Sequence, residues 1–250
     1  LAWLAGQDDL VEAFANGEDV YKIMAAAIYE KPEAQITKDE RFIGKTTVLG
    51  AGYGMGGKKF KLQLQAMGVK LSQKECDHII SVYRDTYPKI PELWESGNSA
   101  LDALIRKKTS PFGLDGVLTV AGAEGIYLPN GLRLRYPDIR WESMLGSNHR
   151  EMVYDTKKGR STLTTRIYGG KVVENVCQAL ARIVVGEQML MVARRYKVAM
   201  TVHDAVVAVV PEADAEEGVR FVEECMRIRP KWAAALPLNC ESKVGASYGG

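Results

Sequence analysis

Two cations, an apolar residue and a tyrosine recur at intervals of four residues between positions 41 and 53. They are Arg41, Lys45, Leu49 and Tyr53. On an α-helix a step of four residues turns by only about 40°, so these four side chains would lie along one slowly winding stripe. The order along the stripe, two positive charges followed by an apolar group and an aromatic ring, matches the polyphosphate, sugar and base of a nucleoside triphosphate. The spacing therefore predicts a helix that binds a nucleotide.

Two other interpretations of this segment have to be weighed. Gly44-Lys45-Thr46 looks like the end of a phosphate-binding P-loop, but Asp39 stands where that motif needs its first glycine. The segment could instead be an ordinary amphipathic helix with surface cations. Against this, six glycines between 44 and 57 would each cost about 1 kcal/mol in a helix interior. So many glycines predict that something large approaches the backbone closely.

A second candidate site is the pair His203-Asp204, which separates the apolar runs 198–202 and 205–210. A two-residue connection between such runs predicts a tight β-hairpin. An Asp in a turn is not by itself evidence of a functional site, because Asp favours turns in general. Here both flanking runs are of a buried type, so we expect the hairpin to lie in a sheet with its tip in a cleft. A carboxylate at that tip is a hard oxygen ligand suited to Mg²⁺.

A third candidate is one face of the helix expected over residues 171–196. Polar side chains fall on this face at spacings of four, three and four: Lys171, Asn175, Gln178 and Arg182. Apolar residues occupy the opposite face: Val172, Val176, Leu180 and Val184. A solvated polar face is common, but amides between cations also suit the minor-groove edges of bases and the phosphates of DNA.

The elements that must position these residues follow a clear order. Helical patterns fill residues 1–107, and short β-type runs fill 109–170. Capping boxes at Thr37–Glu40 and Ser72–Glu75 predict the starts of two helices. Hairpins are expected around Asn130-Gly131 and over 152–167. A helix over 171–196, the strand pair 198–210, a helix over 213–235 and a last strand over 239–248 complete an α+β fold.

Length and composition limit the class of protein. A chain of 250 residues is long enough for one large domain or two modest ones. Its net charge of +2 means that a DNA-binding surface has to be a local patch. Four cysteines without a CxxC spacing indicate reduced thiols. The sequence has no run of about 18 apolar residues, so it predicts no membrane span. We expect a cytoplasmic protein, and the missing initiator Met suggests a piece of a longer one.

Taken together, these segments resemble the C-terminal part of family A (DNA polymerase I-like) DNA polymerases of bacteriophage type. The order of an Arg-x₃-Lys-x₇-Tyr-Gly helix, a Gln-bearing helix and a His-Asp hairpin is similar to that family. The segments 83–90 and 168–178 also look like parts of phage members. Residues 1–6 resemble the stretch immediately after the family's first catalytic motif. The resemblance covers essentially the whole chain.

The resemblance implies a role for each matching position. Arg41 and Lys45 would hold the triphosphate of the incoming dNTP, and Lys45 would also protonate the pyrophosphate leaving group. Tyr53 would lie at the base pair and the template, with Gly54 allowing close approach.

For the later motifs, the resemblance implies that Gln178 contacts the minor groove near the primer end. His203 would support the primer terminus, and Asp204 would bind catalytic Mg²⁺. The partners would be primer-template DNA and dNTPs. The activity would be template-directed DNA synthesis by two-metal nucleotidyl transfer.

The resemblance also implies an arrangement of subdomains. Residues 1–20 would be a helix at the junction of palm and fingers, and residues 21–118 would form helical fingers. Residues 119–250 would form an antiparallel-sheet palm that lacks its first strand. The palm would comprise the hairpin-rich part 119–170, the helix 171–196 and the catalytic hairpin 198–210.

This sequence departs from the family pattern at three places. Leu49 stands where an aromatic residue is usual, so sugar contacts would differ. Ala205 replaces the usual Glu after His-Asp. The first catalytic Asp would precede Leu1, so the second carboxylate ligand of the two Mg²⁺ ions would lie outside the chain. We therefore expect residues 1–250 alone to be inactive, and to self-associate through an exposed sheet edge.

Two alternative functions stay open from the sequence. One is a noncatalytic nucleic-acid-binding module that uses the basic helix face. The other is a P-loop-like NTPase. Discrimination among dNTPs opposite a template base would favour the polymerase, and salt-dependent DNA binding indifferent to dNTP would favour the module.

Overall fold

A computed structural model describes residues 1–143 and 150–248 of the chain. It divides into two compact units, residues 1–176 and 177–250. This boundary differs from the one expected at residue 118, and the assignment of fingers and palm subdomains stays a prediction. Helices and antiparallel sheets make up the described residues, which confirms the predicted α+β class.

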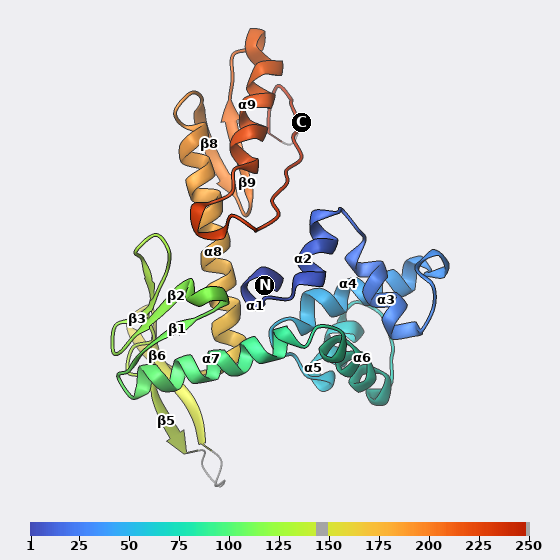
Figure 1. Ribbon diagram of the computed structural model, residues 1–250, viewed down its shortest axis with the longest axis vertical. Coiled ribbons are helices and arrows are strands. Elements are labelled where there is room, and N and C mark those ends of the chain that lie inside the picture. The colour runs from blue at the N-terminus through green and yellow to red at the C-terminus, as the bar shows by residue number, and fades with distance from the viewer. Residues whose placement is uncertain (144–149, 249–250) are drawn as a thin grey trace. The chain divides into compact units, whose positions relative to one another are not determined.

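Helices dominate the first part of the first unit (Figure 1). They are α1 (Ala2–Ala5), α2 (Asp8–Ala15), α3 (Val20–Tyr29), α4 (Lys38–Ala51), α5 (Gly57–Ala66), α6 (Gln73–Thr86) and α7 (Lys89–Ile105). Both predicted capping boxes are present, Thr37 with Glu40 before α4 and Ser72 with Glu75 before α6. In each box the hydroxyl and the carboxylate satisfy backbone N–H groups that the first helical turn leaves without partners.

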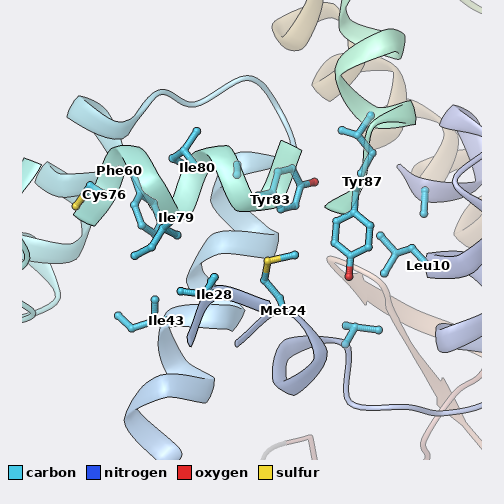
Figure 2. Packing of buried hydrophobic residues seen from close by; sticks show 14 of the residues in the cluster. Leu10, Met24, Ile28, Ile43, Phe60, Cys76, Ile79, Ile80, Tyr83 and Tyr87 are labelled. Carbon is cyan, nitrogen blue, oxygen red and sulfur yellow. The ribbon is translucent and has the colours of Figure 1, made fainter. Parts of the chain in front are cut away.

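The core of this helical part is an apolar cluster to which α2 through α7 contribute. Figure 2 shows Met24 and Ile28 of α3 facing Ile79 and Tyr83 of α6, with Phe60 of α5 alongside. Tyr83 is 1% exposed, and burial raises its pKa because the phenolate would be poorly solvated. The cluster fixes α4 against α3 and α6, and so it fixes the surface that α4 presents to solvent.

Two antiparallel sheets follow in the same unit. The first contains β1 (Thr109–Phe112), β2 (Leu118–Ala121), β3 (Gly125–Tyr127) and β4 (Arg133–Leu134). The second contains β5 (Arg140–Ser143), β6 (Arg150–Lys158) and β7 (Ser161–Ile167). The hairpin predicted around Asn130-Gly131 is formed by β3 and β4, and the one predicted over 152–167 is formed by β6 and β7.

Helix α8 (Gly169–Val192) begins in the first unit and continues into the second. Its predicted apolar face is confirmed, because Val172, Val176, Leu180 and Val184 are all buried. The remaining elements of the second unit are β8 (Lys197–Val202), β9 (Ala205–Val209) and α9 (Ala215–Arg227). Among the described residues, none of the helices combines the length and the hydropathy needed to span a bilayer.

Two predictions about the end of the chain are wrong. The helix expected over 213–235 ends at Arg227, since Ile228 is extended and Arg229 precedes Pro230, a position that disfavours helical backbone. A short 3-10 turn follows over Lys231–Ala233. The strand expected over 239–248 is absent from the described residues, which have no regular structure there.

Candidate functional site

Helix α4 packs unusually closely on α3, and Gly44 permits that contact. A Cβ atom built at Gly44 would lie 2.2 Å from the backbone oxygen of Tyr21 and 3.0 Å from the backbone nitrogen of Ala25. Only a residue without a side chain fits there. The expectation that something large approaches the backbone closely is therefore confirmed at Gly44, where the neighbouring helix α3 occupies that space.

The two predicted phosphate-binding cations lie together on the outer face of α4. The guanidinium of Arg41 is 5.3 Å from the ring centre of Tyr21, and the ammonium of Lys45 is 5.8 Å from the same ring. Both distances are within the range of cation–π attraction. Both cations thus lie over one aromatic ring of α3, with Lys45 near the outer limit of this attraction.

Arg41 also has an ionic partner that the sequence did not reveal. Its Nε donates to Oδ2 of Asp19 at 2.7 Å. The same carboxylate caps α3, accepting from the backbone N–H of Lys22 at 3.2 Å. The hydrogen bond from Arg41 is the main reason why the pKa of Asp19 is lowered. Arg41 is therefore held in place before any ligand arrives.

The stripe does not continue as a helix to its last member. Leu49 lies on α4 and is 57% exposed, but α4 ends at Ala51. The helical position predicted for Tyr53 is wrong. The carbonyl of Gly52 accepts a hydrogen bond from Nε1 of Trp94 at 2.9 Å, and Gly54 has a φ of +81°. These features turn the chain sharply, so Tyr53 lies in the turn after α4.

That turn packs against the start of α8. A Cβ atom at Gly170 would lie 2.4 Å from the backbone oxygen of Tyr53, and one at Gly54 would lie 3.6 Å from the ring of Tyr168. Asn98 of α7 accepts from the backbone N–H of Gly169 at 2.6 Å. The structure therefore brings Tyr53 and Gly54 next to the first turn of α8, as a shared base-pair site would need.

The polar stripe on α8 is present, and its members have partners within the chain. Lys171 pairs with Glu174 at 2.8 Å, and Asn175 donates to the hydroxyl of Tyr136 at 3.1 Å. Tyr136 is buried, which raises its pKa to about 12.

The rest of the stripe lies in the second unit. Gln178 follows on the helix, and Arg182 donates to Oγ1 of Thr201 at 3.5 Å. A contact of these four residues with DNA stays a prediction.

His203 and Asp204 form the turn between β8 and β9, as predicted. His203 has a φ of +53°, a left-handed conformation that is uncommon for residues other than Gly, Asn, Asp or His. The expected burial is wrong, because both turn residues are exposed and neither strand contains a buried residue. Met200 and Val209 are exposed apolar residues on this two-stranded sheet. Self-association through its edge stays a prediction.

A magnesium site needs several oxygen ligands around one ion. In residues 1–143 and 150–248 no three His, Cys, Asp or Glu side chains lie close enough together to hold a metal ion. Asp204 is followed by Ala205, which offers no second carboxylate. The described residues therefore do not make a complete site for Mg²⁺, and Asp204 is at most one of its ligands.

Sequence reasoning missed four residues that shape the candidate site: Asp19, Tyr21, Trp94 and Asn98. Each acts on a residue at least 20 positions away in the chain. Asp19 caps α3 and Tyr21 lies in its first turn, but nothing in their spacing links them to Arg41.

The protein is therefore of the α+β class, and its candidate site is formed by two neighbouring cations on the solvent-facing side of α4. Residues 1–105 match the model of the family described as DNA polymerase family A. Over 99% of its length the chain is 32% identical to the DNA polymerase of Bacillus phage SP02, of which it covers 39%. It is 22% identical over 96% of its length to the DNA polymerase of Bacillus phage SP01, of which it covers 23%. The chain thus spans less than half the length of these curated relatives.

A solved structure supports the same assignment at the level of the fold. The chain is similar to the POL domain of Pol1 from M. smegmatis, in a complex with DNA primer-template and dNTP. The TM-score is 0.61 at 20% identity, covering 95% of this chain and 35% of the other. The chain is thus similar to family A DNA polymerases over residues 1–105 and to phage DNA polymerases over nearly its whole length, in agreement with the resemblance seen in its sequence.

Proposed function

We propose that this chain is the part of a DNA polymerase that binds the incoming dNTP, and that it serves template-directed transfer of a nucleotide to a primer 3′-hydroxyl. The observation that carries the proposal is the placement of Arg41 and Lys45 side by side over the ring of Tyr21. Its relatives include phage DNA polymerases matched along nearly the whole chain.

In this proposal the triphosphate binds to the outer face of α4. Lys45 is exposed and offers three donors, and Arg41 offers a planar fork that suits phosphate oxygens. Arg41 would exchange the carboxylate of Asp19 for a phosphate. This exchange costs little free energy because the Asp19–Arg41 pair is part-exposed, with side-chain exposures of 32% and 39%. Lys45 would then be placed to give a proton to the departing pyrophosphate.

The remaining residues of the proposal follow the same direction along α4. Leu49 would contact the sugar through apolar surface alone, and the turn with Tyr53 and Gly54 would lie at the base pair. Primer-template DNA would contact the polar stripe of α8 and His203. Asp204 would be one ligand of Mg²⁺. The described residues do not complete the site of this ion.

The P-loop alternative is not compatible with the structure. A P-loop is a loop that precedes a helix and wraps phosphate with backbone N–H groups. Gly44, Lys45 and Thr46 lie inside α4, where the hydroxyl of Thr46 donates to the carbonyl of Phe42 at 2.9 Å. Their backbone N–H groups are therefore committed to the helix. The noncatalytic DNA-binding module is the alternative that an experiment has to exclude.

The test is the affinity of the 250-residue chain for dGTP, measured by NMR titration of Lys45→Ala and of Lys59→Ala. Lys59 is an exposed lysine of α5 and changes the net charge equally. Loss of a charge-assisted phosphate contact is worth about 1.5–3 kcal/mol, so Lys45→Ala should weaken dGTP binding roughly 10- to 150-fold. Lys59→Ala should leave it unchanged.

Primer-template binding by the same variants separates the two functions. The proposal expects Lys45→Ala to alter DNA affinity much less than dGTP affinity. If Lys45→Ala weakened DNA binding and left dGTP binding at the wild-type value, α4 would be a contact to the DNA backbone, and the binding module would be the better description.

A further inference from the structure

A cavity of 690 Å³ lies between α7 and the sheet of β5, β6 and β7, away from the cations of α4. Its volume falls within the usual range for small-ligand sites, about 300–1,000 Å³. Two large aromatic side chains line it, Trp141 of β5 and Tyr168 at the end of β7, and each is 38% exposed. Exposed aromatic rings inside a concave site are surfaces on which a flat ligand can stack.

Each of these rings has an arginine beside it. Arg150 lies 5.9 Å from the ring of Trp141, and Arg166 lies 5.9 Å from the ring of Tyr168. These distances are at the outer limit of cation–π attraction, about 6 Å, so neither guanidinium is held tightly by its ring. Both arginines also line the cavity. The site therefore repeats one unit twice: an aromatic ring with a cation next to it.

Hydrogen bonds and an ion pair hold these units in position. Nε1 of Trp141 donates to Asp102 of α7 at 3.4 Å, and Arg166 pairs with Glu151 at 2.9 Å. Arg166 is thus partly neutralised, whereas Arg150 makes its ring contact at the rim of the sheet. Arg150 is the cation better placed to take an added phosphate.

The cavity adjoins the turn that we propose to hold the nascent base pair. Tyr168 is shared between the two, since its ring lies 3.6 Å from the position of a Cβ atom on Gly54. A template strand that leaves this turn unpaired would therefore meet Tyr168, which lines the same cavity as Trp141.

We propose that this cavity binds the unpaired template strand ahead of the nascent base pair, with bases stacked on Tyr168 and Trp141 and phosphate bound by Arg150. The proposal rests on the proposed function. A repeated ring-and-cation unit suits a strand in which base and phosphate alternate, and stacking on aromatic residues is how many proteins bind single strands without reading their sequence. Duplex DNA does not fit, because its base faces are already stacked inside the helix.

The test compares two DNA hairpins with the same duplex, one blunt and one with a four-nucleotide 5′ overhang, at one fixed salt concentration. Binding to the 250-residue chain is followed by fluorescence anisotropy. The wild type should bind the overhang hairpin more tightly. Trp141→Ala should lose about 5- to 150-fold on the overhang hairpin, the usual effect of removing one stacking ring, and little on the blunt one.

Three further variants keep the test decisive. Tyr127→Ala removes a similar ring, 5.7 Å from Arg133, on the other sheet of the same unit, and it should leave the overhang preference intact. Trp141→Phe should retain most of the preference, which separates stacking from a general effect on folding. Arg150→Gln should lower the salt dependence of overhang binding by about one phosphate contact.

Several results would overturn the inference. They are a wild type without overhang preference, a Trp141→Ala variant that keeps it, and equal losses on both hairpins. Binding of free dAMP that depends on Trp141, without any overhang effect, would assign the cavity to a free nucleotide instead. None of these results bears on the dGTP affinity of Lys45→Ala, so the two proposals fail separately.

Discussion

The close contact between α3 and α4 makes a sharp prediction for Gly44→Ala. The added methyl group would sit 2.2 Å from the backbone oxygen of Tyr21, where real contacts stay beyond 3.0 Å. Because the methyl group is fixed directly to the backbone of α4 and the oxygen belongs to the backbone of α3, the two helices would have to separate by roughly 1 Å. Overpacking of this kind costs about 1–3 kcal/mol, and the better helix propensity of Ala returns up to about 1 kcal/mol. Because the clash is with backbone, the cost should lie in the upper part of that range, about 2–3 kcal/mol, and the net loss should be about 1–2 kcal/mol.

Gly50→Ala is the matched control on the same helix. A Cβ atom there would meet Gln63 and Met55 at 3.6 Å, an ordinary contact, so Ala should be neutral or stabilising by up to about 1 kcal/mol. Urea denaturation followed by circular dichroism at 222 nm measures both variants. Equal stability of Gly44→Ala and Gly50→Ala would refute the argument that α3 excludes a side chain at Gly44.

Two further predictions concern charge and pH. Asp19→Asn keeps an equally good cap for α3 but removes the charge that competes for Arg41. Since a part-exposed ion pair is worth about 0.2–1 kcal/mol, dGTP should bind roughly 1.5- to 5-fold tighter in an NMR titration. Unchanged or weaker binding would show that Asp19 does not compete. Tyr136→Phe loses the bond to Asn175 and should cost about 0.5–1.5 kcal/mol at pH 7 in urea denaturation. Because the pKa of Tyr136 is raised to about 12, its phenol contributes stability that is complete below about pH 10 and is lost as the pH rises to about 12. The free energy of unfolding of the variant should therefore fall less steeply with pH over that window than that of the wild type. Equal slopes for the two proteins would contradict this.

Features that depend on neighbours in the sequence were predicted well. The starts of α4 and α6 followed from Thr37 and Ser72, because a capping box joins residues only three positions apart. The hairpin turn at His203 followed equally well from two apolar runs. In both cases the interactions that decide the structure are local.

Features that depend on distant partners were not predictable. Trp94, which binds the carbonyl of Gly52 at the end of α4, lies 42 positions beyond that residue, and the partner of Arg41 lies 22 positions before it. The apolar residues of β8 and β9 suggested burial, but burial depends on which elements cover a sheet, and a single sequence does not state that. Spacing alone placed Arg41 and Lys45 on one face, whereas the ring of Tyr21 that lies beside both came only from the structure.

The exposure of Leu49 has a consequence for how this protein can change over evolution or in the laboratory. Its side chain is 57% exposed on an otherwise well-packed helix, so most replacements there should alter stability by no more than about 0.5 kcal/mol. In the proposed function the same side chain faces the sugar of the nucleotide. Under that proposal, new substrate preferences would be selectable from a library at this one codon without compensating mutations elsewhere. The tightly packed Gly44, five residues earlier, does not allow such changes.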